Sequence, residues 1–140
     1  MGKIVLKDVV VRVDAVNLSA RASRVTINSS RDLVDSTTFG AEYRQNEVGL
    51  GDASIDVTFQ QDFDPASVDA TLWPLHTAGS HFRVQISPRS GAVSPTNPTY
   101  IMEEAVLPSY TPLSGGAGDL STVDVSFQNA GQRGIERVTS

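Results

Sequence analysis

The chain has 140 residues and a mass of 14.9 kDa, which is the usual length of one domain. It contains no cysteine, which excludes disulfides, thiolate catalysis and cysteine-ligated zinc. Sixteen acidic residues outnumber eleven scattered basic ones, and the net charge of −5 argues against a protein that grips nucleic acid through a basic patch. No stretch approaches the ~20 apolar residues that span a bilayer, and the early charges of the N-terminus do not fit a secretory signal.

Alternation of apolar and polar residues predicts β-strands along most of the chain. The clearest case is 54–60, in which Ile55, Val57 and Phe59 alternate with polar residues. Further strands are expected at 9–13, 24–28, 81–87, 100–107, 123–128 and 134–139. One face of such a strand is dry and the other is wet. We therefore expect an all-β fold, a β-sandwich or partly open barrel of about seven or eight antiparallel strands.

One segment follows a helical period instead. Its apolar stripe consists of Val68, Leu72 and Leu75. We expect Asp64 to cap the helix and Pro65 to be its first residue, because proline is tolerated at that position. Pro74 should end or kink the helix. The sequence thus predicts one short flanking α-helix near residues 65–76.

Two long connections separate the expected strands. Residues 30–51 lack a clear period, and a connection of this length is typical of a functional loop or a binding arm. Residues 87–99 contain three prolines and are expected to form a constrained loop. Gly115–Gly118 should form a turn before the last long strand, because no lysine or helix follows it as a phosphate-binding loop would require.

Two strands repeat one motif. Residues 54–60 and 122–128 both have the order hydroxyl, apolar, Asp, Val, hydroxyl, Phe, Gln. One interpretation is that two half-buried strands share a binary pattern by chance. The other is that both strands lie in one sheet and present an Asp, a hydroxyl and a Gln to a common polar surface.

Residues that could carry catalysis or bind a metal are sparse. His76 and His81 lack an evident third ligand, and Asp62 and Asp64 lack the further oxygen ligands of a calcium site. The adjacent carboxylates of Glu103–Glu104 should point to opposite faces of a strand and cannot share a substrate atom. We therefore expect no enzyme activity, no metal site and no cofactor.

Short motifs in a fixed order run through most of the chain, from about residue 13 to 139. They are 16–19 (VNLS), 35–40 (DSTTFG), 55–59 (IDVTF) with 61–63 (QDF), 72–75 (LWPL), 96–98 (TNP) and 118–120 (GDL). With the strand plan, the single helix and the long connection, these motifs resemble the major tail tube proteins of long-tailed, siphovirus-like bacteriophages. Such proteins are similar in fold to the tube protein of contractile tails and to the ring protein of type VI secretion.

The resemblance implies a structural virion protein of the phage tail, assembled in the host cytoplasm from a single domain, 1–140. Hexameric rings would stack into a hollow tube through which double-stranded DNA passes without specific binding. Tape measure, tail terminator and distal tail proteins would be partners, and a membrane would not. About four strands per subunit would join into one barrel, which would enclose a water-filled channel and leave no unpaired edges.

Three groups of residues receive roles from this resemblance. Six polar residues are the candidate lumen-facing set, with the outer face of the tube as the alternative: Asp56, Thr58, Gln60, Asp124, Ser126 and Gln128. Residues 30–51 correspond to an extended hairpin that reaches a neighbouring subunit, with Phe39, Tyr43 and Leu50 as apolar anchors, and a surface loop is the alternative. Residues 1–8 and 134–140 are possible terminal arms.

A different class of function stays open at this point. The alternatives are a tail terminator, a secretion-type ring, a capsid-decorating protein and a carbohydrate-binding module. A sugar-binding platform would need exposed aromatic side chains on its strands, and most strand aromatics here alternate inward.

Overall fold

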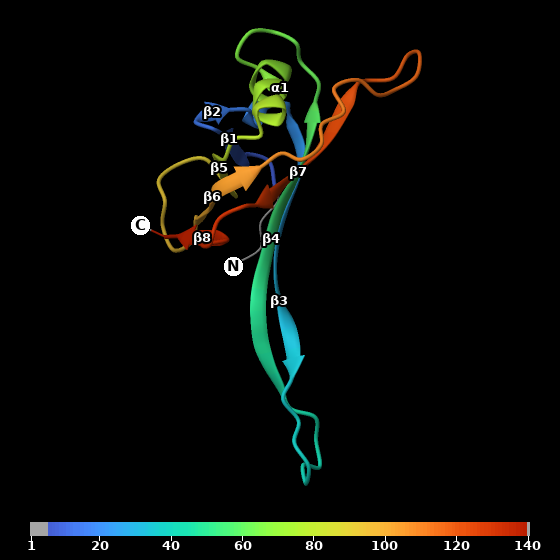
Figure 1. Ribbon diagram of the computed structural model, residues 1–140. Coiled ribbons are helices and arrows are strands. Elements are labelled where there is room, and N and C mark those ends of the chain that lie inside the picture. Colours follow the sequence, from blue (N-terminus) through green and yellow to red (C-terminus); the bar gives the residue numbers. More distant parts are fainter. Residues whose placement is uncertain (1–5, 140) are drawn as a thin grey trace.

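The computed structural model of the chain describes residues 6–139 (Figure 1). Its strands are β1 (Val10–Val13), β2 (Val16–Asn17), β3 (Ala22–Asp35), β4 (Asn46–Gln60), β5 (Phe82–Ser87), β6 (Thr99–Val106), β7 (Thr122–Asn129) and β8 (Ile135–Val138). A 3₁₀ turn, η1 (Ser19–Arg21), precedes β3, and the helix α1 (Val68–Ala78) follows β4. All eight strands of the described residues belong to one open antiparallel sheet, which confirms the expected all-β fold with one short helix.

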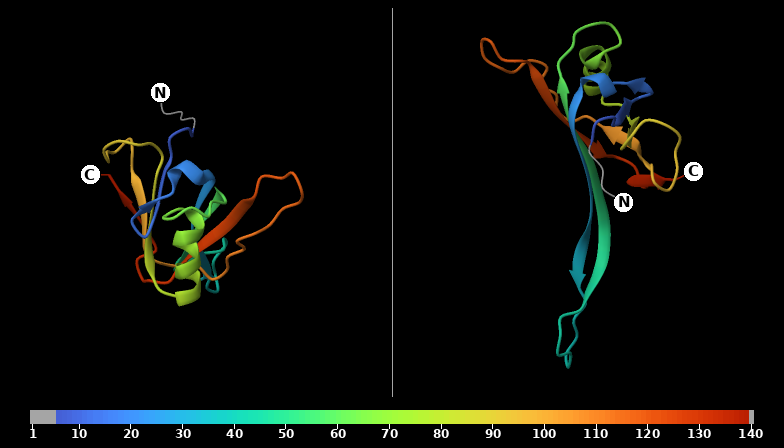
Figure 2. Two further views of the ribbon diagram at one scale, coloured as in Figure 1. Left: turned by 90° about the horizontal axis from the view of Figure 1, so that it is seen from above. Right: turned by 180° about the vertical axis from the view of Figure 1, so that it is seen from behind.

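The sheet has the strand order β2-β1-β5-β6-β7-β4-β3, and β8 pairs with β6 beside the end of β7. β6 and β7 are joined through two residue pairs, Ala105 with Asn129 and Val106 with Gln128. The sheet bends at this short ladder, so that β7, β4 and β3 lie across the core from β1, β5 and β6 (Figures 1 and 2). β3 is the edge strand at one end of the sheet.

The core lies between the two parts of the sheet. Alternate residues of β4, β5 and β7 enter it, as the sequence pattern predicts. The rings of Phe82 and Phe127 meet edge to face, with centroids 5.6 Å apart, in a favourable aromatic geometry. The largest fully buried side chains are Phe59, Phe127, Ile55, Leu72 and Met102.

The helix α1 covers one end of this core (Figure 1). The expected apolar stripe is confirmed, because Val68 and Leu72 are fully buried and Leu75 packs against them. The helix was expected near 65–76 and lies at Val68–Ala78, but the expected cap, Asp64, was wrong. Ser67 is the N-cap, three residues after Asp64, and Pro74 lies inside the helix rather than at its end.

A long hairpin, β3 and β4, projects from the body (Figures 1 and 2). Much of the predicted connection 30–51 is strand, because β3 continues to Asp35 and β4 begins at Asn46. The ladder is interrupted by one irregularity near Arg31 and then resumes. The projecting part is therefore a two-stranded ribbon, which we call the arm (residues 30–51), and residues 36–45 form its tip.

The two terminal segments differ in what the structure describes. Residues 1–5 and 140 lie outside the described residues, so part of each expected terminal arm cannot be placed. Residues 135–138 form β8, which pairs with β6 of the same chain. A role for either terminus between subunits stays a prediction.

Candidate assembly surfaces

One face of the β3–β4–β7 layer is polar, and the repeated motif builds it. β4 and β7 are antiparallel neighbours, with Asp56 opposite Ser126 and Thr58 opposite Asp124. The structure thus brings the two motifs together in one sheet, as the second interpretation of the repeat proposed. Because Ile55, Val57 and their counterparts on β7 enter the core, the alternate residues of both strands point away from it. The face contains all six predicted lumen residues, Asp56, Thr58, Gln60, Asp124, Ser126 and Gln128.

Side-chain hydrogen bonds order this polar face. The Thr58 hydroxyl donates to an Asp124 carboxylate oxygen over 2.6 Å, across the two strands. The Asn28 amide on β3 donates to a carboxylate oxygen of Asp56 over 3.2 Å. Gln128 donates to the Ser126 hydroxyl over 2.6 Å. These bonds hold short polar side chains along the sheet surface.

The polar face has a shallow depression with a mixed charge. It is lined by Arg24 and Thr26 of β3, by Ser109, and by residues of β4 and β7 that include both aspartates. The two carboxylates outnumber the single guanidinium, so the balance along the depression is negative. Sequence reasoning missed Arg24, although its place in the alternation of β3 puts it on this face.

The arm carries the three predicted apolar anchors, and all three are exposed. Phe39 is 108% exposed at the tip, and Tyr43 is 83% exposed beside it. Leu50 is also 83% exposed but lies near the base of the arm, so the structure separates it from the other two. A monomer gains nothing from exposed apolar side chains on a projecting ribbon, and such residues commonly mark an interaction surface.

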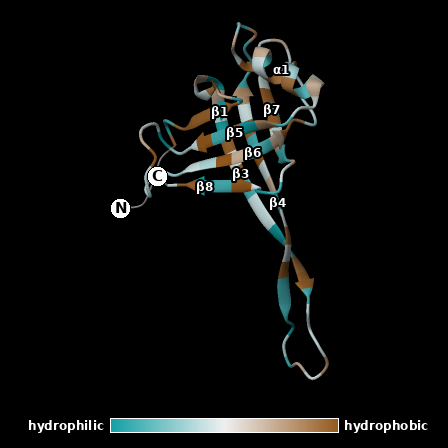
Figure 3. Cartoon of the chain, turned by 60° about the vertical axis from the view of Figure 1, so that its left-hand side comes forward, coloured by the Kyte–Doolittle hydropathy of each residue, from teal (hydrophilic) through white to brown (hydrophobic). Residues whose placement is uncertain are grey.

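Sequence reasoning missed further apolar residues of the arm. Leu33 and Val48 face each other across the two strands, and Val34 follows Leu33. All three are more than half exposed. Figure 3 shows hydrophobic residues on this projecting part of the hairpin. The signal in the sequence was the adjacent apolar pair Leu33-Val34 within the expected arm 30–51.

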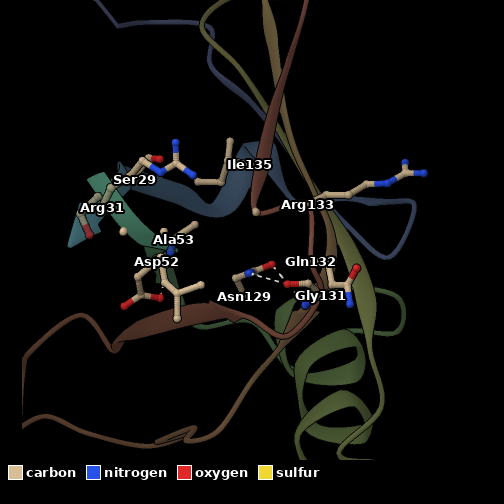
Figure 4. Close-up of a pocket in the computed structure, with 14 residues that line it drawn as sticks. Ser29, Arg31, Asp52, Ala53, Asn129, Gly131, Gln132, Arg133 and Ile135 are labelled. Carbon is tan, nitrogen blue, oxygen red and sulfur yellow. Dashed lines mark hydrogen bonds between the residues drawn. The ribbon is translucent and has the colours of Figure 1, made fainter. Parts of the chain in front are cut away.

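A groove of about 690 Å³ lies where the arm leaves the body (Figure 4). One wall comes from β3 and β4, with Ser29, Arg31 and Ala53, and the other comes from the β7–β8 connection. In the β7–β8 connection, the Asn129 side-chain amide donates to the Gly131 carbonyl over 2.9 Å. Figure 4 shows Arg133 pointing away from the groove.

The end of the body opposite the arm also exposes apolar side chains. Phe63 lies in the connection to α1, and Leu113 and Leu120 lie in the long connection between β6 and β7. Trp73 is half exposed on α1 with its ring near Tyr110. The arm and the end that carries α1 lie at opposite ends of the long axis (Figure 2), so exposed apolar side chains are present at both ends.

Hydrogen bonds of Asp62 and Tyr110, and an ion pair of Asp62, link α1 and the β6–β7 connection to the body. Asp62 accepts hydrogen bonds from the Asp64 amide and the Ser67 hydroxyl and pairs with Arg21 at 2.8 Å, and these contacts lower its pKa to about 2. Burial raises the pKa of Tyr110 to about 12, and its hydroxyl donates to Asp69 over 3.0 Å. These contacts have a structural role, since Asp62 and Tyr110 are both engaged in hydrogen bonds within the chain.

The other candidate groups are dispersed. Nδ1 of His76 lies 3.0 Å from the Leu107 carbonyl, and His81 lies 3.7 Å from Glu104 on the surface. Glu103 forms an ion pair with Arg83, whereas its sequence neighbour Glu104 lies near His81, so the two carboxylates have different partners. Between residues 6 and 139, His, Asp and Glu side chains form no group of three that could hold a metal ion. Within the same range, no helix is long and apolar enough to cross a membrane.

Comparison with solved structures gives matches over almost the whole chain. No family model matches the sequence, and no curated protein matches it. The tail of an empty gene transfer agent (GTA) particle, refined with C6 symmetry, superposes with a TM-score of 0.75 at 15% identity, over 99% of this chain and 100% of that one. The SPP1 tail tube gives a TM-score of 0.70 at 13% identity, over 95% and 76% of the two chains.

A third match comes from an extracellular contractile injection system. A chain from the structure of its sheath/tube terminator in the extended state superposes with a TM-score of 0.74 at 14% identity, over 96% of each chain. Sequence identities this low show a common fold and nothing finer. The chain therefore has the tail tube fold that it was expected to have, the fold shared by the GTA tail and the SPP1 tail tube.

Proposed function

We propose that this chain is a structural subunit of a phage-like tail, and that its copies form hexameric rings that stack into a hollow tube for genome delivery. The observation that carries the proposal is the end-to-end superposition on the GTA tail chain, with both chains covered almost completely. The C6 symmetry of that tail supports a six-fold ring here. The subunit performs no catalytic step and needs no cofactor, because its role follows from shape and self-assembly.

The open sheet supports assembly on physical grounds. β3 is a 14-residue edge strand, and its outer side has no partner among the described residues. Such an edge presents unpaired N–H and C=O groups to solvent and is a template for pairing with another strand. In the proposed ring, neighbouring copies continue the β3–β4–β7 layer into a closed wall. Closure removes the exposed edges, and rotational symmetry repeats one contact around the ring.

The polar face is proposed to line the lumen. A wall that lets DNA slide must avoid Lys and Arg contacts to phosphate, since each such contact adds affinity. The proposed lumen set has two aspartates and no basic residue, and among the described residues Arg24 is the cation that lines the same depression. Short hydroxyl and amide side chains, held against the sheet by hydrogen bonds such as that from Thr58 to Asp124, would not project into the path of the DNA.

The arm is proposed to contact a neighbouring subunit or ring. Its anchors Phe39 and Tyr43 lie at the tip of a two-stranded ribbon, and exposed apolar side chains are also present at the opposite end of the body. Head-to-tail stacking needs unlike surfaces at the two ends of each copy. Tape measure, terminator and distal tail proteins are the expected partners at the ends of the tube.

Electron microscopy of the purified protein tests the assembly. With rising protein concentration, we expect rings and then long hollow tubes whose end views show six subunits. The double variant Phe39→Ser/Tyr43→Ser should remain folded but give shorter tubes or isolated rings. Globular monomers of the unaltered protein at every concentration would contradict the proposal.

A graded charge series tests the lumen assignment. Asp56 and Asp124 are changed together to Asn, which keeps shape and removes charge, and then together to Lys. We expect tubes of normal length in both variants. Particles with the Lys variant should release DNA more slowly than particles with the Asn variant, and more so at low salt. Equal release rates for the two variants would assign the polar face to another position in the tube.

A second candidate function is that of the terminator, which closes a tube at one end. It is suggested by the TM-score of 0.74 to a chain from the structure of a sheath/tube terminator. A terminator should stop at a single ring, whereas a tube subunit should elongate at its own ends. The number of rings in particles formed by the pure protein therefore separates the two functions.

A further inference from the structure

The tip of the arm, residues 36–45, is held by its own hydrogen bonds. The Thr37 amide donates to an Asp35 carboxylate oxygen over 2.9 Å. The Thr37 hydroxyl accepts from the Gln45 amide over 2.8 Å and donates to the Gln45 carbonyl over 3.3 Å. The Ser36 amide donates to the same carbonyl over 2.8 Å. These bonds close the neck of the tip at the point where the β3–β4 ladder ends.

The apex of the tip is also ordered. The Ala41 amide donates to the Thr38 carbonyl over 3.3 Å and closes a four-residue turn. Gly40 has a φ of +91°, which the third position of a type II turn requires and which glycine adopts without strain. Phe39 therefore occupies the corner of the turn, and its ring points into solvent.

A ten-residue tip far from the core has no burial to keep it in one conformation (Figure 1). Exposed loops normally remain mobile, and binding must then order them at a cost in entropy. The neck bonds already supply this order in the monomer. The hydroxyl of Thr37 is central because it bonds both the amide and the carbonyl of Gln45.

We propose that Thr37 is a positioning residue for assembly, and that its hydroxyl presets the tip so that Phe39 and Tyr43 dock on a second copy of this chain. The inference rests on the proposed function and adds a specific residue to it. Thr37 itself need not touch the second copy, since it acts through the conformation of the tip. Loss of its hydroxyl should weaken assembly while the body of the monomer keeps its stability.

Three variants test the inference. Thr37→Val keeps the shape and removes the hydroxyl, and Thr37→Ser keeps the hydroxyl. Thr38→Val removes a neighbouring hydroxyl that makes no hydrogen bond to any other residue between 6 and 139. The critical concentration for tube formation is measured by sedimentation. We expect Thr37→Val to raise it about fivefold or more, the range for loss of one to two hydrogen bonds, and the two other variants to match the unaltered protein.

A second measurement follows the neck directly. Trypsin cleaves after Arg44, which lies inside the tip, and cleavage requires the tip to open. Below the critical concentration, Thr37→Val should be cut at this site several times faster than Thr38→Val, with an unchanged melting temperature for both. Equal cleavage rates and equal critical concentrations for Thr37→Val and Thr38→Val would overturn the inference and leave the proposed function standing. Absence of tubes from the unaltered protein would overturn both.

Discussion

Replacement of a single phenylalanine by alanine should separate folding from assembly, depending on its position. Phe127 lies on β7 with no exposed surface, and its ring meets that of Phe82. A buried Phe→Ala change loses the transfer free energy of the ring and leaves a cavity, together about 3–5 kcal/mol. The edge-to-face contact accounts for roughly 0.5–1.5 kcal/mol of that loss. A domain of this kind has about 5–15 kcal/mol of stability, so Phe127→Ala should lose a large fraction of it.

Phe39→Ala is the matched control, with the same chemical change at a fully exposed ring. Its effect on the free energy of unfolding should be within about 0.5 kcal/mol, as for surface substitutions in general. Urea unfolding followed by circular dichroism, below the concentration at which tubes form, measures both variants. Sedimentation then measures assembly, which Phe39→Ala should weaken although the monomer is intact. A loss under about 1 kcal/mol for Phe127→Ala would refute the packing described for the core.

Three further variants probe single contacts. Gly131→Ala should lower the free energy of unfolding by about 1–3 kcal/mol, because the added Cβ would lie 2.9 Å from Cβ of Glu104. Gly51→Ala is the control in urea titrations, since a Cβ added there would lie 3.5 Å or more from its nearest neighbours. Stability should fall as the pH drops from about 4 to about 2, because Asp62 binds a proton in the unfolded chain near its ordinary pKa but in the folded chain only near pH 2. Asp62→Asn should flatten this part of an acid titration followed by circular dichroism. Tyr110→Phe should cost about 1 kcal/mol in urea, since its hydroxyl bonds Asp69 and Gln61, and an unchanged midpoint would argue against this pair of bonds.

The strands that border the core were predictable from the sequence. Alternation in 54–60 and 122–128 reports burial on one face, and both segments lie in strands with their apolar residues inside. The pairing of the two motifs was open, because a binary pattern identifies strands and not their neighbours. The ladder between β4 and β7 decides that question.

The arm and the helix boundaries were harder to predict. Beyond the body, β3 and β4 have no core on either face, so Leu33 and Val48 follow no pattern of burial although they are paired strand residues. The start of α1 depends on Asp62, which lies too far before the helix to be recognised as a cap from the sequence. Its carboxylate accepts a hydrogen bond from the Ser67 hydroxyl and pairs with Arg21. Such contacts between separate segments leave no local signal.

The edge of β3, which is unpaired among the described residues, bears on how copies of the chain avoid incorrect association before assembly. From residue 22 to 35 it contains neither proline nor lysine, and its charged residues, such as Arg24 and Arg31, leave the stretch 25–30 uncharged. Backbone groups do not distinguish one extended segment from another, so fidelity must come from side chains such as Arg24 and Thr26 that fit a single offset. Newly made copies would then avoid incorrect strand pairing only at low concentration, or where an existing tube end or initiator adds them in the correct register.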